Sequence, residues 1–450
     1  MRRLTPDAIK TRRLIAAVAL VAMALAGSAA RAQDDWLDGV PGFDVLLDKK
    51  ELTVEQRRER NQLVRDALRA RVAPELGEPD ALLSQSTVSA LQEAILRYRA
   101  IAASGGWPEL PDKVTLRLND SGDNVSILRR RLLITGDLPK ARGRDWGYDG
   151  AVGEAVARFQ FRHGLRTTGN VDGRTRRALN VPAAERLGQL RVNLDRLKKL
   201  MKKTSAPRYV MVNVPGYRLE AMDRGRLALR SNVVVGKPDR ATPELSARIV
   251  EVNFLPHWRV PDSIARKDLI PQIRNDPDYF YREHFSVMPS WGAKPLNPSQ
   301  INWSSPKVAS YKFRQDPGPF NALGVVRINM PNKHVVYLHD TPLKQLFRQS
   351  TRAFSSGCVR VERVLDLAAW LLQGEPGWSR QRIDGVIGSN SSDDVRLSKP
   401  VPVHFIYVSA WAGPGGVAHF RQDIYGRDGL LQVAGHEPDE DAPVLTSITP

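Results

Sequence analysis

The stretch SSGCVR, residues 355–360, contains the single cysteine in a chain of 450 residues. A lone cysteine is either a small buried hydrophobe or a reactive thiol, and composition by itself favours the buried hydrophobe. The segments on either side of Cys358 shift the balance toward a reactive thiol. They also predict how the surrounding chain folds.

The segment upstream of Cys358 predicts a base near the thiol. KHVVYLHD, residues 333–340, reads as a strand that ends at His339. Thr341 and Pro342 then favour the start of a helix, because threonine caps helices and proline suits their first position. We therefore expect the imidazole of His339 at a strand end, where it can accept the thiol proton.

The segment downstream predicts a helix that begins at the cysteine. VRVERVLDLAAWLLQG has apolar residues at helical spacing and ends with Gly374. A helix N-terminus and the charge of Arg360 would both lower the pKa of the Cys358 thiol. Gly357 allows close approach of a substrate, and the amides of Gly357 and Cys358 are candidate oxyanion donors.

A metal site is not expected. His334 and His339 are five residues apart in a predicted strand, so they point to opposite faces. No other histidine or carboxylate cluster has ligand spacing, so the sequence predicts neither metal nor cofactor.

The N-terminus predicts export. Residues 1–32 combine early cations, an apolar run and an A-x-A cleavage pattern, as in a secretory signal peptide; an uncleaved membrane anchor is the alternative. Removing these residues lowers the formal charge from +18 to +13, because they hold six Lys/Arg and one Asp. A basic exported protein suits a polyanionic cell wall or has an ordinary basic surface, and export argues against nucleic acid. The expected location is the periplasm, with no membrane span after cleavage.

The periodicity divides the chain into a helical part and a β part, a multidomain α+β fold. Short alternating segments after residue 208 predict an antiparallel, β-sandwich-like domain. The strands are interrupted by an aromatic-rich excursion, which is typical of a lid or binding element. The expected boundaries are 1–32 signal peptide, 33–112 helical scaffold, 113–182 three-helix domain, 183–207 helical linker, 208–430 catalytic domain with an insertion at about 262–320, and 431–450 disordered tail.

Two resemblances follow from specific motifs. YDGAVGEAVARFQFRHGLRTTGNVDGRTRRALN resembles the small three-helix peptidoglycan-binding domain. HDTP followed by RAFSSGCVRV, with NVVVGKPDRATPE and FLPHWRVPDSI upstream, resembles the active-site region of bacterial L,D-transpeptidases. Many members have histidine just before the Gly-Cys pair, where this chain has Ser356. The long Gram-negative branch, which has a peptidoglycan-binding domain and a capping insertion, also has serine there.

The resemblance implies a two-step acyl transfer on peptidoglycan. Cys358 would attack the bond between the third-position diamino acid and D-Ala of a tetrapeptide stem, and the thioester would pass to the amine of a second stem as a 3-3 cross-link. His339 would act as base and then as acid, with Gly357 as a backbone oxyanion donor. The remaining residues would contact the substrate or wall the cleft: Tyr337, Arg360, Ser356 and Trp258.

Other functions are alternatives to 3-3 cross-linking. Water as acceptor implies a carboxypeptidase or cross-link hydrolase, and a protein lysine implies lipoprotein anchoring. A non-catalytic wall-binding scaffold is a further alternative. The resemblance also implies acylation by carbapenems and allows cell-wall synthesis proteins as partners.

Overall fold

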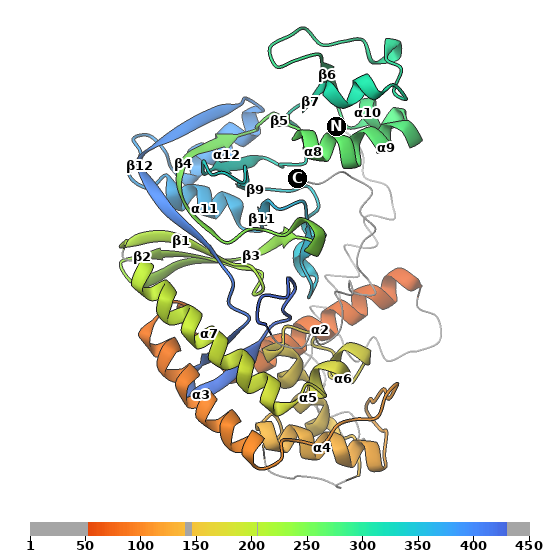
Figure 1. The fold of residues 1–450 in the computed structure, drawn as a ribbon, viewed down its shortest axis with the longest axis vertical. Coiled ribbons are helices and arrows are strands. Elements are labelled where there is room, and N and C mark those ends of the chain that lie inside the picture. Colours follow the sequence, from red (N-terminus) through yellow and green to blue (C-terminus); the bar gives the residue numbers. More distant parts are fainter. Residues whose placement is uncertain (1–52, 140–145, 205, 430–450) are drawn as a thin grey trace, which may run out of the picture. The chain divides into compact units, whose positions relative to one another are not determined.

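The computed structural model describes residues 53–139, 146–204 and 206–429 (Figure 1). They form two compact units, one from 53–78 and 96–186 and the other from 79–95 and 187–429. The chain is therefore a multidomain α+β protein. The predicted signal peptide at 1–32 and tail at 431–450 lie outside the described residues. Within those residues, no helix has both the length and the apolarity to cross a bilayer.

The first unit is helical. Its helices are α2 (Val54–Leu76), α4 (Asp123–Thr135), α5 (Gly150–Arg162) and α6 (Gly173–Leu179). Asp149 and Asp172 cap α5 and α6 by accepting the backbone N–H of Val152 and Thr175, which satisfies donors that a helix start leaves free. Apolar residues that recur at helical spacing, among them Val125, Leu128, Val152 and Phe159, are fully buried in one core.

Gln160 holds the turn at residues 168–170, which precedes α6, by hydrogen bonds. Its side-chain oxygen accepts the N–H groups of Thr168 and Gly169, and its amide donates to Asn170 O. His163 is the C-terminal cap of α5 and is buried, with Nδ1 2.7 Å from Phe159 O.

Two long helices cross the sequence boundaries between the units: α3 (Gln85–Ala103) and α7 (Ala183–Lys203).

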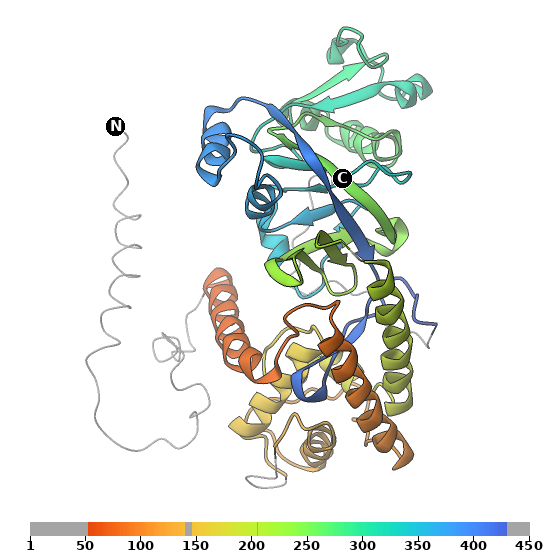
Figure 2. The same ribbon diagram turned by 90° about the vertical axis from the view of Figure 1, so that its left-hand side faces the viewer.

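The second unit contains a closed, mixed barrel (Figure 1 and Figure 2). Its strands are β1 (Arg208–Asn213), β2 (Arg218–Asp223), β3 (Arg226–Gly236), β4 (Leu245–Phe254), β8 (Val326–Asn329), β9 (Leu338–His339), β11 (Val359–Val361) and β12 (Asp393–Ile406). The order β3-β11-β9-β8-β4-β12-β1-β2 closes because β2 also pairs with β3, and β10 (Ala353–Ser355) adds to β3.

The expected antiparallel sandwich is therefore wrong in two respects. The sheet closes on itself, and the pairs β1–β12, β9–β11 and β3–β10 are parallel. Alternating residues identify strands, but they carry no information about which distant strand becomes the partner. The barrel core also receives residues from α11 (Val364–Leu371) and α12 (Arg380–Ser389).

The excursion between β4 and β8 builds its own small layer. Strands β5 (Trp258–Arg259), β7 (Lys312–Gln315) and β6 (Phe285–Met288) form a sheet in that order. Short helices accompany it: α8 (Asp262–Ile264), a helical turn at Ala265–Leu269, α9 (Ile270–Asn275) and α10 (Asp278–Arg282). Its aromatic residues form a separate buried cluster, which explains their density in the sequence.

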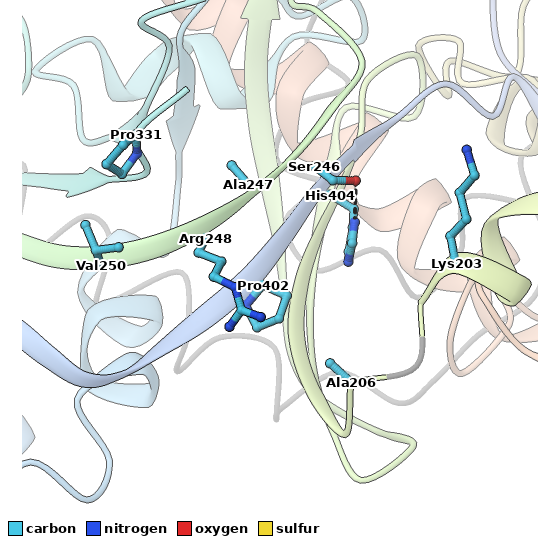
Figure 3. A pocket seen from close by; sticks show the side chains of 9 residues that line it. All are labelled: Lys203, Ala206, Ser246, Ala247, Arg248, Val250, Pro331, Pro402 and His404. Atoms are coloured by element: carbon cyan, nitrogen blue, oxygen red, sulfur yellow. Dashed lines mark hydrogen bonds between the residues drawn. The ribbon is translucent and has the colours of Figure 1, made fainter. Parts of the chain in front are cut away.

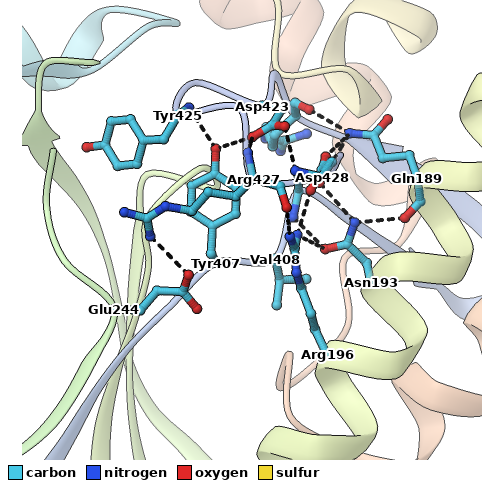
Figure 4. A network of polar contacts seen from close by, with 12 residues as sticks. Gln189, Asn193, Arg196, Glu244, Tyr407, Val408, Asp423, Tyr425, Arg427 and Asp428 are labelled. Carbon is cyan, nitrogen blue, oxygen red and sulfur yellow. Dashed lines mark hydrogen bonds and ion pairs between the residues drawn. The ribbon is translucent and has the colours of Figure 1, made fainter. Parts of the chain in front are cut away.

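Strands β13 (Ala410–Gly413) and β14 (Val417–Phe420) form a hairpin near the C-terminal end of the second unit, and a polar network follows it (Figure 4). Asp428 accepts hydrogen bonds from Ser409 and Arg196, and Asn193 donates to Ser409. This network ties the segment after β14 to α7.

Candidate active site

Strand register brings the predicted catalytic side chains together. In the parallel pair β9–β11, Val359 lies opposite Leu338, and both are buried in the barrel core. Arg360 lies opposite His339, so these two share the other face, away from the core. Along the next pair, Arg327 of β8 lies opposite His339.

Tyr337 contacts Cys358 and also the side chains of His339 and Arg327. Its carbonyl accepts the N–H of Val359 at 3.1 Å, its ring meets that of His339 edge-on at 5.7 Å, and its side chain hydrogen-bonds to Cys358. Arg327 lies over the Tyr337 ring, 5.3 Å from its centroid. Among the described contacts, no hydrogen bond joins Cys358 directly to His339.

Cys358 does not lie at a helix N-terminus, contrary to the expectation. It follows a turn after β10 and immediately precedes β11, and α11 begins only at Val364. The helix expected after Thr341 is also wrong, since only a 3-10 turn forms at Lys344–Arg348. Both segments carry helical periodicity, but pairing with β3 and β9 makes the residues after Cys358 a strand.

Hydrogen bonds within the turn that carries Cys358 stabilise this turn. Ser355 Oγ donates to Cys358 O at 2.5 Å and accepts Gly357 N–H at 3.1 Å. Gly357 has φ of 120°, a conformation that side chains rarely adopt, so glycine is needed there for its backbone. Since the Gly357 amide is already used, the Cys358 amide is the remaining candidate oxyanion donor.

Burial dominates the electrostatics of the site. It raises the pKa of the Cys358 thiol to about 11, although hydrogen bonds from Tyr337 and the charge of Arg360 act in the opposite direction. Burial, followed by the Arg360 charge, lowers the pKa of His339 to about 3. The expected lowering of the thiol pKa is therefore wrong for this structure, in which thiol and imidazole are both neutral.

The Arg360 side chain has no hydrogen-bonding partner among the described residues. All three of its guanidinium nitrogens are buried without a hydrogen bond in the part of the chain that the structure describes. His339 and Arg360 have no exposed surface. Leaving a buried cation unpaired costs stability, and such a group needs an explanation, such as a catalytic role or a bound ion.

The other two predicted residues lie at the edge of this group. Trp258 is buried in the core of the excursion, against which Tyr337 packs. Ser356 Oγ lies 2.9 Å from Arg240 Nη1, and the same guanidinium binds both oxygens of Asp268 at 2.5 and 2.9 Å. Arg240 thus joins the excursion to the turn that carries Cys358.

Comparison of the sequence with known protein families gives a match that includes the residues of this site. Residues 207–378 match the family described as "L,D-transpeptidase catalytic domain". These residues form an L,D-transpeptidase catalytic domain. The family is one of acyltransferases. Residues 121–179 match the family described as "Putative peptidoglycan binding domain", which covers α4, α5 and α6.

Individual relatives agree with this assignment of the catalytic domain. A protein of Haemophilus influenzae named "Putative L,D-transpeptidase" is 36% identical over 226 residues, which are 50% of this chain and 45% of that protein. The chain thus covers about half the length of this relative.

Two solved structures are matched at low similarity. The L,D-transpeptidase from Stackebrandtia nassauensis has 12% identity and a TM-score of 0.23, over 68% of this chain and 98% of that one. The L,D-transpeptidase from Mycobacterium smegmatis has 13% identity and a TM-score of 0.20, over 45% and 59%. At such scores these likenesses carry no argument.

The catalytic domain also has a hollow of about 580 Å³ that contains none of the predicted site residues (Figure 3). It is lined by Lys203, Ala206, Ser246, Ala247, Arg248, Val250, Pro331, Pro402 and His404. His404 Nδ1 is hydrogen-bonded to Ser246 Oγ at 2.9 Å. The hollow is open, and its cations Lys203 and Arg248 are exposed.

Sequence reasoning missed three residues beside the site: Arg327, Arg240 and Asp268. Arg327 reaches the site only through strand register. Arg240 lies within NVVVGKPDRATPE, a segment that supported the resemblance, but nothing in the sequence connects it to Asp268 or Ser356.

Proposed function

We propose that this chain is an L,D-transpeptidase that joins peptidoglycan stems by 3-3 cross-links through a thioester on Cys358. The observation that carries the proposal is a thiol beside Tyr337, together with a fully buried His339 and a fully buried, unpaired Arg360 on adjacent strands. A substrate with carboxylate and amide groups would supply partners for the Arg360 side chain. The three-helix domain would hold the same polymer, and the cell envelope, specifically the periplasm, would be the location.

In the first step, the thiol proton passes to His339 and the sulfur attacks the carbonyl carbon of the L,D peptide bond. The tetrahedral oxyanion is stabilised by the Cys358 amide, with Gly357 contributing if its N–H leaves Ser355. The C–N bond then breaks, His339 returns the proton to the leaving amine, and D-Ala departs. In the second step, the amine of another stem loses a proton to His339, attacks the thioester and releases the thiol.

The structure without substrate does not favour the initial proton transfer. The thiol pKa is about 11 and the imidazole pKa about 3, so an ion pair is strongly disfavoured. A substrate carboxylate bound to Arg360 would screen the cation that lowers the His339 pKa. Substrate binding would thus help to activate the base, and Tyr337, Ser356 and Trp258 would shape the cleft around it.

The deciding experiment is incubation of the full chain with purified tetrapeptide muropeptides, followed by mass spectrometry of the products. Cross-linked dimers with loss of one D-Ala per bond support the proposal. Tripeptides alone would indicate water as acceptor, and cleavage of added dimers a hydrolase. Transfer to a lysine peptide would indicate anchoring.

Two variants connect any product to the site. Cys358→Ala should form no dimer and no covalent adduct with a carbapenem, whereas dimer formation by this variant would refute the assignment. His339→Gln should lower the rate at least a hundredfold, as expected for loss of a general base. His404→Gln, which changes a histidine in the open hollow, is the matched control and should retain activity.

A further inference from the structure

The side of the catalytic turn away from Ser355 is held by a threonine to which no role has been assigned. Thr242 is fully buried, and its hydroxyl donates to Gly357 O at 2.9 Å while accepting Gly236 N–H at 2.8 Å. A hydroxyl can donate and accept at once, and valine, which has the same shape, can do neither.

Thr242 is itself held by a tyrosine from the C-terminal end of the unit. The Tyr425 hydroxyl accepts Thr242 N–H at 3.1 Å and donates to Gly236 O at 2.5 Å. Tyr425 N–H donates to the Tyr407 hydroxyl at 2.9 Å, which donates to Asp423 at 2.5 Å (Figure 4). An unbroken series of hydrogen bonds therefore runs from Asp423 to the carbonyl of Gly357.

Because of the geometry of the peptide bond, the hydrogen bond from Thr242 to Gly357 O also affects the direction of the next amide. The carbonyl of Gly357 and the N–H of Cys358 belong to one peptide unit, which is planar and trans, so they point in opposite directions. Holding the carbonyl at Thr242 fixes the direction of the Cys358 N–H. That N–H is the candidate oxyanion donor that Ser355 does not occupy.

We propose that Thr242 is a positioning residue that aims the Cys358 amide at the developing oxyanion, and that Tyr425 keeps Thr242 in place. The proposal rests on the function proposed above. It predicts a defect confined to reactions that pass through a tetrahedral oxyanion. Reactions in which the sulfur attacks a saturated carbon should not depend on Thr242.

Two reagents separate these cases in the full-length protein. A carbapenem acylates the sulfur: the thiol proton is transferred, sulfur bonds to the lactam carbonyl, the C–N bond opens and the nitrogen keeps the proton. Iodoacetamide alkylates the same sulfur, releasing iodide and a proton, without an oxyanion. Intact-mass spectrometry follows both rates.

For Thr242→Val we expect carbapenem acylation to fall by about a hundredfold, the scale of losing one oxyanion donor, while alkylation stays within about twofold. Thr242→Ser should restore acylation, and Tyr425→Phe should cause a smaller fall. Thr87→Val is the matched control, because Thr87 is buried and its hydroxyl donates to Ala81 O in the same unit. It should leave the ratio of the two rates unchanged.

A parallel loss of both rates, or wild-type acylation by Thr242→Val, would overturn the proposal. If Thr242→Val does not fold, Tyr425→Phe carries the same comparison, and an unchanged ratio of the two rates in Tyr425→Phe would count against the proposal. Failure of the proposed function has a different signature: the wild-type protein would be alkylated at Cys358 but never acylated.

Discussion

Arg360 and His339 lie directly opposite each other on the parallel strands β11 and β9, and neither has any exposed surface. The charge of Arg360 opposes protonation of His339 and favours ionisation of Cys358. Burial is the largest influence on both groups, and this single cation adds to it at the base and opposes it at the nucleophile. Replacing Arg360 or His339 should therefore change how the site responds to pH, and this change can be measured.

The first prediction concerns stability at acid pH. The folded-state pKa of His339 is lowered from 6.5 to about 3, so its contribution to stability is complete above about pH 6.5 and is lost as the pH falls toward 3. His339→Gln should lose less unfolding free energy than wild type between pH 7 and 4.5, by an amount on the order of a few kcal/mol. Urea unfolding at both pH values measures this difference. His404→Gln, at a less buried site, should behave closer to wild type, and identical acid sensitivity of all three proteins would contradict the prediction.

The second prediction concerns the charge of Arg360. Because this cation lowers the Cys358 pKa, Arg360→Gln should move the pH profile of iodoacetamide alkylation to higher pH. A shift of one pKa unit would reduce the rate at pH 8 about tenfold. Arg208→Gln removes a different arginine, which is partly buried and lies over Trp370, and should leave the profile unchanged. An unshifted profile in Arg360→Gln would show that the cation does not act on the thiol.

The third prediction concerns the contact between the excursion and the catalytic turn. Asp268→Ala removes the carboxylate that Arg240 binds, which should favour opening of the excursion by about 1 kcal/mol, or about fivefold. Cys358 should then be alkylated several-fold faster, and hydrogen exchange at 262–275 should increase. Asp276→Ala breaks an exposed ion pair with Arg282 within the same excursion and should change neither. Equal effects of the two variants would mean that Arg240 does not hold the excursion closed.

The fourth prediction concerns the first unit. Arg162 and Asp137 form a bidentate, almost fully buried ion pair with both N–O distances at 2.6 Å. Asp137→Ala leaves the cation buried without its partner and should destabilise this unit by about 3–5 kcal/mol. Urea unfolding monitored by amide exchange in α5 would measure the loss. Glu75→Ala, which removes the exposed partner of Arg158, should cost less than about 1 kcal/mol; a similar cost for both would contradict the argument.

Much of the fold could be read from local pattern. The helices of the first unit follow from periodicity and from caps such as Asp149 and Asp172, because these depend on residues within one or two turns. The strands after residue 208 follow from alternation in the same way. Barrel closure could not be predicted, since the pairings β2–β3 and β1–β12 depend on distant segments.

The features of the candidate site were likewise predictable only where the local sequence determines them. Cys358, His339 and Gly357 are recognisable from local motifs, because a unique thiol, a histidine at a strand end and a glycine in a turn are visible in sequence. The direction of the thiol pKa was predicted incorrectly. It depended on a helix that does not form at Cys358 and on a burial that only the packed structure reveals.

The sequence by itself thus determined the chemistry that is available: one sulfur, one nearby imidazole, and the segments that carry them. The tertiary structure decided how these groups are tuned and held, through the pairing of Arg360 with His339, the excursion held by Arg240, and Thr242 behind Gly357. The physical reason is the distance along the chain over which each effect acts. Propensity and capping act over a few residues, whereas strand register, desolvation and Coulombic interaction depend on which distant residues become neighbours in space.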